Sequence, residues 1–494
     1  MRGIDTPVRQ SRRRVFKEVA NLAFNSTNLK DDCEALPYKI VDYEVSDYWE
    51  NVYRDRAIIR ERIRLAMGMS LRPENREHPG HLTEGIEESD IAEKYYEPPL
   101  MQVIPSACNA CPENKYIVTN ECMGCVAHPC QEVCPKGAIS FVNGKSVIDQ
   151  EKCIKCGKCY QICPYDAICH KERPCKAACG IQAIESDKHG RAKINNDKCV
   201  SCGMCMVSCP FGAIADKSQI FQLIRAMQSG KTIIAQVAPA FVGQFGSKVT
   251  PEMFKTALKD LGFADVYETA IGADLGCIAE AEHYVREVAT GKQSFALTSC
   301  CPSWSVMAKN LFPETIDKIS NELTPMVATA RIIKQEHPDA KVVFIGPCAS
   351  KKLEASRRTV RSDVDFVITF EELVGMFEAK GLLLEEIKAM DEMVGATSAG
   401  RGYGVAGGVA SAIADCIDAY YPGTPIHIEH AEGLAECKKV LMLAKAGKMN
   451  GCLIEGMACP GGCVAGAGTN LPILTAQREV AKFKATSVKK VPEN

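Results

Sequence analysis

The sequence has no long apolar run and almost no net charge. A transmembrane helix needs about 20 consecutive apolar residues, and no segment offers them, so we expect no association with a membrane. The formal net charge is −2 over 494 residues, whereas binding to nucleic acid needs an excess of positive charge. Membranes and nucleic acids are therefore excluded as expected partners.

The sequence also lacks the features of an export signal. Residues 11–17, Ser-Arg-Arg-Arg-Val-Phe-Lys, faintly resemble a twin-arginine signal, but polar residues interrupt the apolar stretch that should follow. The segment is better interpreted as an amphipathic helix. We therefore expect a soluble, cytoplasmic protein with reduced thiols.

Cysteine is present in excess. The 27 cysteines are far too many for an ordinary cytosolic enzyme, and the chain is too long for a small disulfide-stapled scaffold. Hydrophobic residues make up 46% of the chain, which allows a sizeable buried core. Metal ligation is therefore the predicted role of most cysteines.

The chain divides into three regions by composition. Residues 1–104 are charged, show helical periodicity over 12–24 and 49–67, and form a mostly helical region of unknown role. Residues 105–218 are rich in cysteine and proline, as expected where metal clusters replace a hydrophobic core. Residues 219–494 alternate apolar runs with amphipathic helices, which predicts an α/β domain with a largely parallel sheet. The runs predicted to be buried strands are 232–237, 295–298, 342–345, 366–370 and 453–454.

The middle region repeats one turn four times. Each copy places a cysteine four residues before an Ala-Ile pair, and three copies have proline directly after the cysteine. In ferredoxins such a cysteine ligates the neighbouring cluster, while the three cysteines before it hold their own cluster. The repeated cysteines are Cys134, Cys163, Cys179 and Cys209.

This rule predicts how the cysteines share 4Fe–4S clusters. The three complete sets are Cys153, Cys156 and Cys159 with Cys134; Cys122, Cys125 and Cys130 with Cys163; and Cys199, Cys202 and Cys205 with Cys179. A fourth set, with Cys175 and Cys209, needs Cys108 and Cys111 from upstream and leaves Cys169 spare. We therefore predict three to four accessory clusters. Zinc knuckles are the alternative, although zinc sites rarely use such runs.

Three apolar runs of the last region end in loops that carry cysteine. Ligands of α/β proteins bind at the carboxyl ends of the strands, so the three loops can converge on one buried site. From the residues alone this predicts one further 4Fe–4S cluster. The segments are 298–304 (TSCCPSW), 346–354 (GPCASKKLE) and 455–463 (EGMACPGGC).

Together these segments resemble the active-site signature of the iron-only (FeFe) hydrogenases, and the resemblance covers residues 220–474. It implies a catalytic domain with parallel sheets in two lobes, preceded by ferredoxin-like modules. It also implies an H-cluster, a 4Fe–4S cubane joined through Cys463 to a two-iron subsite with carbonyl, cyanide and an amine-containing dithiolate. The implied cubane ligands are Cys301, Cys348, Cys459 and Cys463.

The resemblance also implies roles for single residues. Cys300 matches the proton-relay thiol beside the bridging amine, and Lys351 matches the residue that pairs with a cyanide. Glu280 and Ser320 match members of the family's proton path. Other matched positions near the subsite are Glu354, Met457, Ala238, Pro239 and Ala240.

Some positions depart from the family pattern and place the chain in a divergent branch. His283 stands where the proton path usually has a second glutamate, and an imidazole can also relay protons. Gly346 replaces a methionine before Pro-Cys, which removes a bulky neighbour of the bridging ligands. Met326 lies near a usual glutamine.

The predicted function is an FeFe hydrogenase that interconverts two protons, two electrons and H2. Electrons would come from ferredoxin or a similar one-electron carrier, since no flavin or nicotinamide site is evident, and maturation proteins would insert the two-iron subsite. Two alternatives stay open: a hydrogen or redox sensor on the same fold, and an iron–sulfur assembly factor resembling hydrogenase-like proteins. Retention of Cys300, Lys351, Glu354 and Met457 counts against the assembly factor.

Overall fold

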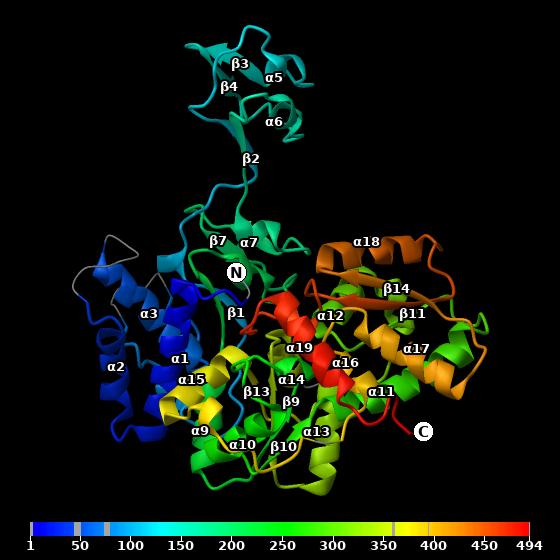
Figure 1. Cartoon of the computed structure of the whole chain (residues 1–494). Coiled ribbons are helices and arrows are strands. Elements are labelled where there is room, and N and C mark those ends of the chain that lie inside the picture. The colour runs from blue at the N-terminus through cyan, green and yellow to red at the C-terminus, as the bar shows by residue number, and fades with distance from the viewer. Residues whose placement is uncertain (1–2, 44–50, 74–79, 358–360, 394, 494) are drawn as a thin grey trace.

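The computed structural model describes residues 3–43, 51–73, 80–357, 361–393 and 395–493. Figure 1 shows a large body that contains two parallel sheets, and a smaller lobe that stands away from it. Within the described residues, no helix is both long and apolar enough to cross a membrane.

The larger sheet has four parallel strands in the order β10-β9-β12-β13. Strands β9 and β13 are buried along their whole length and β12 is buried after Lys341, because helices cover a parallel sheet on both faces and favour continuous apolar runs. The predicted strands 232–237, 342–345 and 366–370 are confirmed. The observed strands are β9 (Ile233–Val237), β10 (Asp265–Glu268), β12 (Lys341–Gly346) and β13 (Phe366–Thr369).

The smaller sheet has three parallel strands in the order β11-β15-β14. The predicted strands 295–298 and 453–454 are confirmed, so the α/β prediction with largely parallel sheets holds for this region. The strands are β11 (Ala296–Leu297), β14 (His427–Glu432) and β15 (Cys452–Met457).

Helices connect these strands and cover them. Helix α13 packs on β9 and β12, α15 packs on β12 and β13, and α17 and α18 pack on β15. The helices are α9 (Ile220–Gln228), α10 (Pro251–Leu261), α11 (Ala270–His283), α12 (Pro302–Leu311), α13 (Pro325–Glu336), α14 (Ser350–Ser356), α15 (Phe370–Lys380), α16 (Ser398–Gly402), α17 (Gly408–Tyr420), α18 (Leu434–Lys445) and α19 (Ile473–Ala485).

The described residues among the first hundred contain four helices. The helix predicted over 49–67 begins at Val52, and residues 49 and 50 lie outside the described residues. Helix α1 crosses α15 at Gly375, where an added Cβ would lie 2.7 Å from the Phe16 side chain. Val19 belongs to the same apolar core as the larger sheet. The helices are α1 (Pro7–Asn25), α2 (Leu29–Ile40), α3 (Val52–Ala66) and α4 (Ile86–Ser89).

The cysteine-rich region divides between the body and the lobe. In the body, β1 pairs with β8 and β6 pairs with β7; in the lobe, β2 pairs with β5 and β3 pairs with β4, all antiparallel. The body holds β1 (Met101–Val103), α7 (Pro174–Ala177), β6 (Ile184–Ser186), β7 (Ala192–Ile194), α8 (Met204–Ser208) and β8 (Ile214–Asp216). The lobe holds β2 (Lys115–Val118), α5 (Pro129–Glu132), β3 (Ile139–Val142), β4 (Lys145–Ile148), α6 (Lys158–Ile162) and β5 (Ile168–Lys171).

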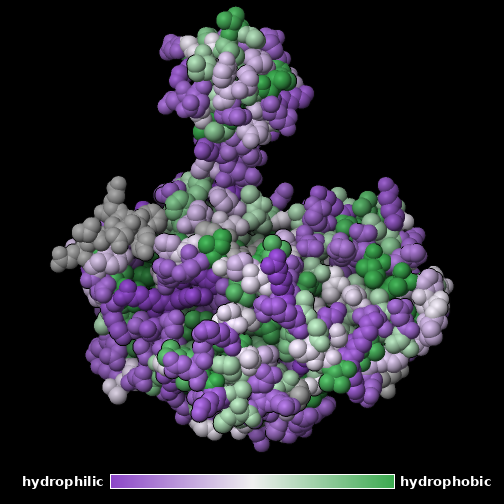
Figure 2. All heavy atoms as spheres, in the orientation of Figure 1, coloured by the Kyte–Doolittle hydropathy of each residue, from purple (hydrophilic) through white to green (hydrophobic). Residues whose placement is uncertain are grey.

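The lobe exposes several large apolar side chains. Val126 is 99% exposed, and Met123 and Ile154 are more than half exposed. Figure 2 shows green groups at the tip and flank of the lobe, among hydrophilic neighbours. Contiguous exposed apolar surface is a common mark of a protein-contact site.

A buried ion cluster ties the cysteine-rich region to the α/β body. The Lys352 ammonium on α14 donates to Asp216 at the end of β8 over 2.6 Å and to Glu372 on α15 over 2.7 Å. All three side chains are at most 9% exposed. Because buried charges need partners, this cluster holds three elements in one relative position.

Candidate metal centre and proton path

A buried cavity lies where the carboxyl ends of strands from both sheets meet. Its walls come from the segments that follow β9, β11, β12 and β15. The cavity volume is about 80 Å³, whereas a single water molecule needs about 10–15 Å³. The predicted site residues that line it are Ala238, Pro239, Ala240, Cys300, Cys301, Cys348, Lys351, Met457, Cys459 and Cys463.

Four thiols in this cavity come from three loops. Cys301 precedes α12, Cys348 follows β12, and Cys459 and Cys463 follow β15. All four are free of disulfides. Burial raises the pKa of the Cys348 thiol to about 11, and the nearby Cys301 adds to this effect. Four sulfur donors around one dry space suit the ligand requirement of a 4Fe–4S cubane.

Backbone geometry fixes two of these thiols. The backbone N–H groups of Ser303, Trp304 and Ala458 hydrogen-bond Cys301, although burial raises its pKa overall. Cys463 follows Gly462, whose φ is +87°. A Cβ added to Gly462 would lie 2.4 Å from the backbone nitrogen of Ala406. Only glycine allows that close approach.

Cys300 and Lys351 meet at the edge of the same cavity. The Lys351 ammonium donates to Glu354 over 2.7 Å and to the Cys300 carbonyl over 3.3 Å. Burial disfavours the ammonium, but the Glu354 carboxylate and nearby thiols outweigh it, so the pKa of Lys351 is raised. Burial and then Glu455 raise the pKa of Cys300 well above its ordinary value. The cavity wall therefore carries a fixed cation and a protonated thiol.

Glu280, on α11, is a buried carboxyl group close to Cys300. Burial raises its pKa to about 7, although a hydrogen bond from Ser320 opposes the shift. The Ser320 hydroxyl in turn accepts a hydrogen bond from the backbone N–H of Glu322 over 3.2 Å. Glu322 is exposed, and its charge reaches Glu280. Glu322, Ser320, Glu280 and Cys300 therefore lie near one another between the surface and the cavity.

His283 lies three residues after Glu280 on α11 and is half-buried. Residues three apart on a helix share a face, so both belong to one side of α11. The sequence prediction missed Glu322, which lies in a polar segment without motif spacing.

Phe344 and Tyr403 also line the cavity, although the sequence did not predict them. A Cβ added to Gly346 would lie only 2.6 Å from the Phe344 ring. The Phe344 ring therefore fills the space that a larger side chain at position 346 would need. Burial raises the pKa of the Tyr403 phenol well above the ordinary value. Met326 lines the same space.

One accessory set surrounds a small cavity of its own in the lobe. Cys134, Cys153, Cys156 and Cys159 line it together with apolar side chains such as Ile139. The second set of the lobe is spread over a cluster and a loop. Cys130 and Cys163 lie in one apolar cluster, while Cys122 and Cys125 are half-buried in the preceding loop. Cys169 lies on β5, opposite Ile117.

Two more sets lie in the body. Burial raises the pKa of Cys175 to about 12, and Cys209, Cys108 and Cys111 are near enough to contribute. The pKa of Cys205 is raised, chiefly by burial and then by its set partners Cys202, Cys199 and Cys179. Cys175 of the other set adds to the same shift. The two sets are therefore neighbours.

The second body set also reaches the main cavity. Cys202 lines that cavity and lies near Cys301. The order of the thiol groups in space is consequently the Cys175 set, the Cys205 set and the main cavity.

Comparison with known proteins fits this arrangement. Residues 231–467 match the family described as the iron-only hydrogenase large subunit, C-terminal domain, and residues 146–169 and 192–215 match a 4Fe–4S binding domain. Iron hydrogenase 1 of Clostridium pasteurianum is 30% identical over 388 residues, which cover 68% of this chain and 67% of the relative. The chain belongs to the iron-only hydrogenase family.

The chain is also similar to an iron–sulfur assembly factor and to a solved hydrogenase structure. The cytosolic Fe-S cluster assembly factor NAR1 of Meyerozyma guilliermondii is 30% identical over 134 residues, 24% of this chain and 25% of that protein. A solved structure of a variant of the FeFe-hydrogenase HydA1 from Chlamydomonas reinhardtii is 24% identical, with a TM-score of 0.44, and covers 53% of this chain and 87% of its own. Membership makes this chain an iron–sulfur protein of an oxidoreductase family.

Proposed function

We propose that this iron-only hydrogenase family member catalyses the reversible conversion of two protons and two electrons into H2. One observation carries the proposal: besides Cys202 of the neighbouring set, a single buried cavity is lined by the four thiols of Cys301, Cys348, Cys459 and Cys463 and, beside them, by the protonated thiol of Cys300 and the cation of Lys351. Four thiols alone would serve an electron-transfer cluster. The additional Cys300 and Lys351 give the cavity a proton donor and a charge that a simple cluster site does not need.

The cavity residues fit an H-cluster. Cys301, Cys348, Cys459 and Cys463 would hold the cubane, and the two-iron subsite would supply the chemistry that makes or breaks the H–H bond. Lys351 would donate to an anionic cyanide, a strong contact in a dry pocket, with Glu354 keeping its ammonium in place. Met457 and the segment Ala238, Pro239 and Ala240 would exclude water around the subsite.

Protons would move through Cys300, Glu280 and Ser320. A carboxyl group with a pKa of about 7 both accepts and donates protons at neutral pH. Glu322, whose backbone N–H hydrogen-bonds Ser320 and whose charge acts on Glu280, would supply an outer carboxylate to this path. His283, one helical turn from Glu280, would supply a second proton carrier. Glu322 would then take the place of the glutamate that His283 replaces.

Electrons would reach the cubane through the four cysteine sets. The sets in the lobe would receive them from ferredoxin or a similar one-electron carrier, and the Cys175 and Cys205 sets would pass them to the cavity. Separate maturation proteins would insert the two-iron subsite, since the cavity is buried and offers no means of building it.

The decisive test is the full chain produced anaerobically with hydrogenase maturation factors. We expect carbonyl and cyanide infrared bands and H2 production from reduced ferredoxin. Cys300→Ala should keep the bands and lower turnover by about 10²- to 10⁴-fold, the usual contribution of a positioned proton donor. Absence of the bands in the wild type would refute the hydrogenase proposal, and full activity of the Cys300→Ala variant would refute the relay.

The assembly factor is the second candidate, since similarity to NAR1 favours it. An assembly factor without a two-iron subsite has no use for Cys300 or for a buried Lys351. It predicts iron–sulfur clusters without carbonyl and cyanide bands, so the same spectra separate the two candidates. Bands accompanied by very slow turnover would favour a sensor.

A further inference from the structure

The helical first region carries no cysteine set, yet α3 packs directly on one. Ile58 and Leu65 of α3 belong to the same apolar cluster as Cys209 and Ala213, and Cys108 packs against it. Ile58, Arg62 and Leu65 are spaced four and three residues apart, so they share one face of the helix. That face covers the turn of Cys209.

Arg62 places a buried charge against this turn. Its Nη2 donates to the Gly212 carbonyl, three residues after Cys209, over 3.0 Å. The side chain is 6% exposed, and its Nε and Nη1 have no hydrogen-bond partner among the described residues. Burial lowers the pKa of its guanidinium only to about 10, so the charge persists at neutral pH.

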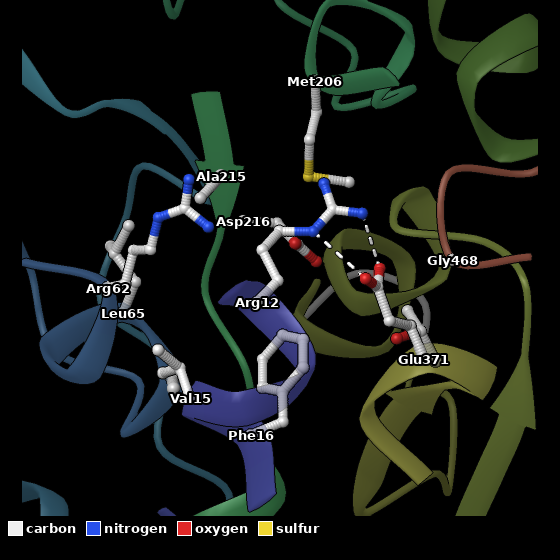
Figure 3. A pocket seen from close by; sticks show the side chains of 12 residues that line it. Arg12, Val15, Phe16, Arg62, Leu65, Met206, Ala215, Asp216, Glu371 and Gly468 are labelled. Atoms are coloured by element: carbon white, nitrogen blue, oxygen red, sulfur yellow. Dashed lines mark hydrogen bonds and ion pairs between the residues drawn. The ribbon is translucent and has the colours of Figure 1, made fainter. Parts of the chain in front are cut away.

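The carboxylate whose charge acts on Arg62, that of Glu371, is bound by another arginine. Figure 3 shows Arg62 and Arg12 entering one pocket from α3 and α1, and dashed lines join Glu371 to Arg12. Arg12 binds Glu371 through two nitrogens, over 2.7 and 3.2 Å. The remaining group of opposite sign that acts on Arg62 is Cys209. An isolated buried cation is unfavourable, and a cluster held by four thiolates would place a negative group next to it.

We propose that Arg62 is the fixed counter-charge of the 4Fe–4S cluster held by Cys108, Cys111, Cys175 and Cys209, and that it raises the reduction potential of this cluster. When the cluster takes up one electron its negative charge grows by one, and a nearby buried cation stabilises that state most. Net charge and solvent exposure are among the factors that set such potentials, and α3 supplies a buried charge and covers the turn of Cys209. This inference rests on the proposed iron–sulfur function and gives the first region a role in it.

The test is a redox titration of the full chain with its 4Fe–4S clusters reconstituted, followed by electron paramagnetic resonance, which needs no two-iron subsite. In Arg62→Leu, we expect the ratio of reduced to oxidised cluster at a fixed potential to fall at least tenfold, a downward shift of about 59 mV for one electron. The shifted signal should be the one that Cys209→Ser alters. Arg62→Lys should restore most of the wild-type titration.

Arg60→Leu is the matched control, because this substitution removes the same charge from the half-exposed Arg60–Glu34 pair on another face of α3. Equal titrations of the Arg62→Leu and Arg60→Leu variants would overturn the proposal, as would an equal shift of every cluster. If the Arg62→Leu variant does not bind the cluster, the uncharged Arg62→Gln variant is titrated in its place. A reduction potential equal to that of the wild type in Arg62→Gln would refute the role of the charge. Wild-type protein that binds no clusters would instead refute the proposed function itself.

Discussion

Glu280 is the residue whose environment most directly predicts a pH dependence. Its pKa of about 7 lies above the ordinary value of 4.5 because the carboxyl group is buried. H2 oxidation needs the carboxylate to accept protons, so its rate should rise as the pH increases through 7. H2 production needs the acid form, so its rate should fall over the same range.

Steady-state rates in both directions between about pH 5 and 9 check this. Glu280→Gln cannot relay protons and should lower both rates by about 10²- to 10⁴-fold. Glu282→Gln is the control, since that exposed carboxylate on the same helix pairs with Arg286. Unchanged pH profiles in Glu280→Gln would show that protons take another route.

Lys351 is the residue expected to hold the two-iron subsite in place. Lys351→Met should weaken retention of the subsite by about 10- to 100-fold, the worth of a charged hydrogen bond, while the cubane stays because its four cysteines are intact. Infrared band intensity per iron atom measures this. Lys351→Arg should keep part of the signal, and a Lys351→Met variant with full bands would exclude the contact.

At the residue scale, spacing made the cysteines predictable, whereas burial made other residues important. Cys301 and Cys463 stand in recurring motifs, so their meeting in one cavity could be expected. Arg62 and Glu322 lie in charged segments and resemble many neighbours in the sequence. What distinguishes them is a packed environment, and no local pattern encodes it.

Among the helices, α14 carries two adjacent lysines that contact different parts of the molecule. Lys351 reaches the cavity, and Lys352 reaches the buried cluster with Asp216 and Glu372. Lys352→Met leaves two buried carboxylates, Asp216 and Glu372, without this cation and should lower the free energy of unfolding by about 3–5 kcal/mol. Lys439→Met breaks an exposed pair with Glu436 and should cost at most about 1 kcal/mol.

Thermal or denaturant unfolding under anaerobic conditions compares the two variants. An equal effect of the two substitutions would mean that the Lys352 cluster is not a structural link.

The elements themselves were predictable in proportion to their burial. The run 233–237 is apolar almost throughout because β9 is covered on both faces, and this pattern identifies a strand. The edge strand β14 was not predicted, because His427, Glu429 and His430 give it no apolar run. The docking of α1 on α15 could not be foreseen either, since an amphipathic face does not specify its partner.

At the scale of the whole molecule, the lobe is the expected site of electron entrance. Removing residues 115–171 and joining the ends by a short turn should delete two clusters, about eight iron atoms per chain. Ferredoxin-dependent turnover should fall at least tenfold, because the exposed apolar surface and both lobe clusters are gone. Turnover with a small soluble dye should persist, since the body keeps its own cysteine sets.

Iron analysis and the two assays on the same preparation check this prediction. A ferredoxin-dependent rate equal to that of the wild type would place electron entrance in the body.

The antiparallel pairing of β2 with β5 has a consequence for how such a chain arises. Lys115 stands opposite Lys171, so the chain leaves the body and returns to it at one point (Figure 1). The lobe is therefore a single insertion in the polypeptide, and one genetic event at one position would add or remove it. The number of clusters in the proposed electron route can thus evolve separately from the cavity that the four thiols line.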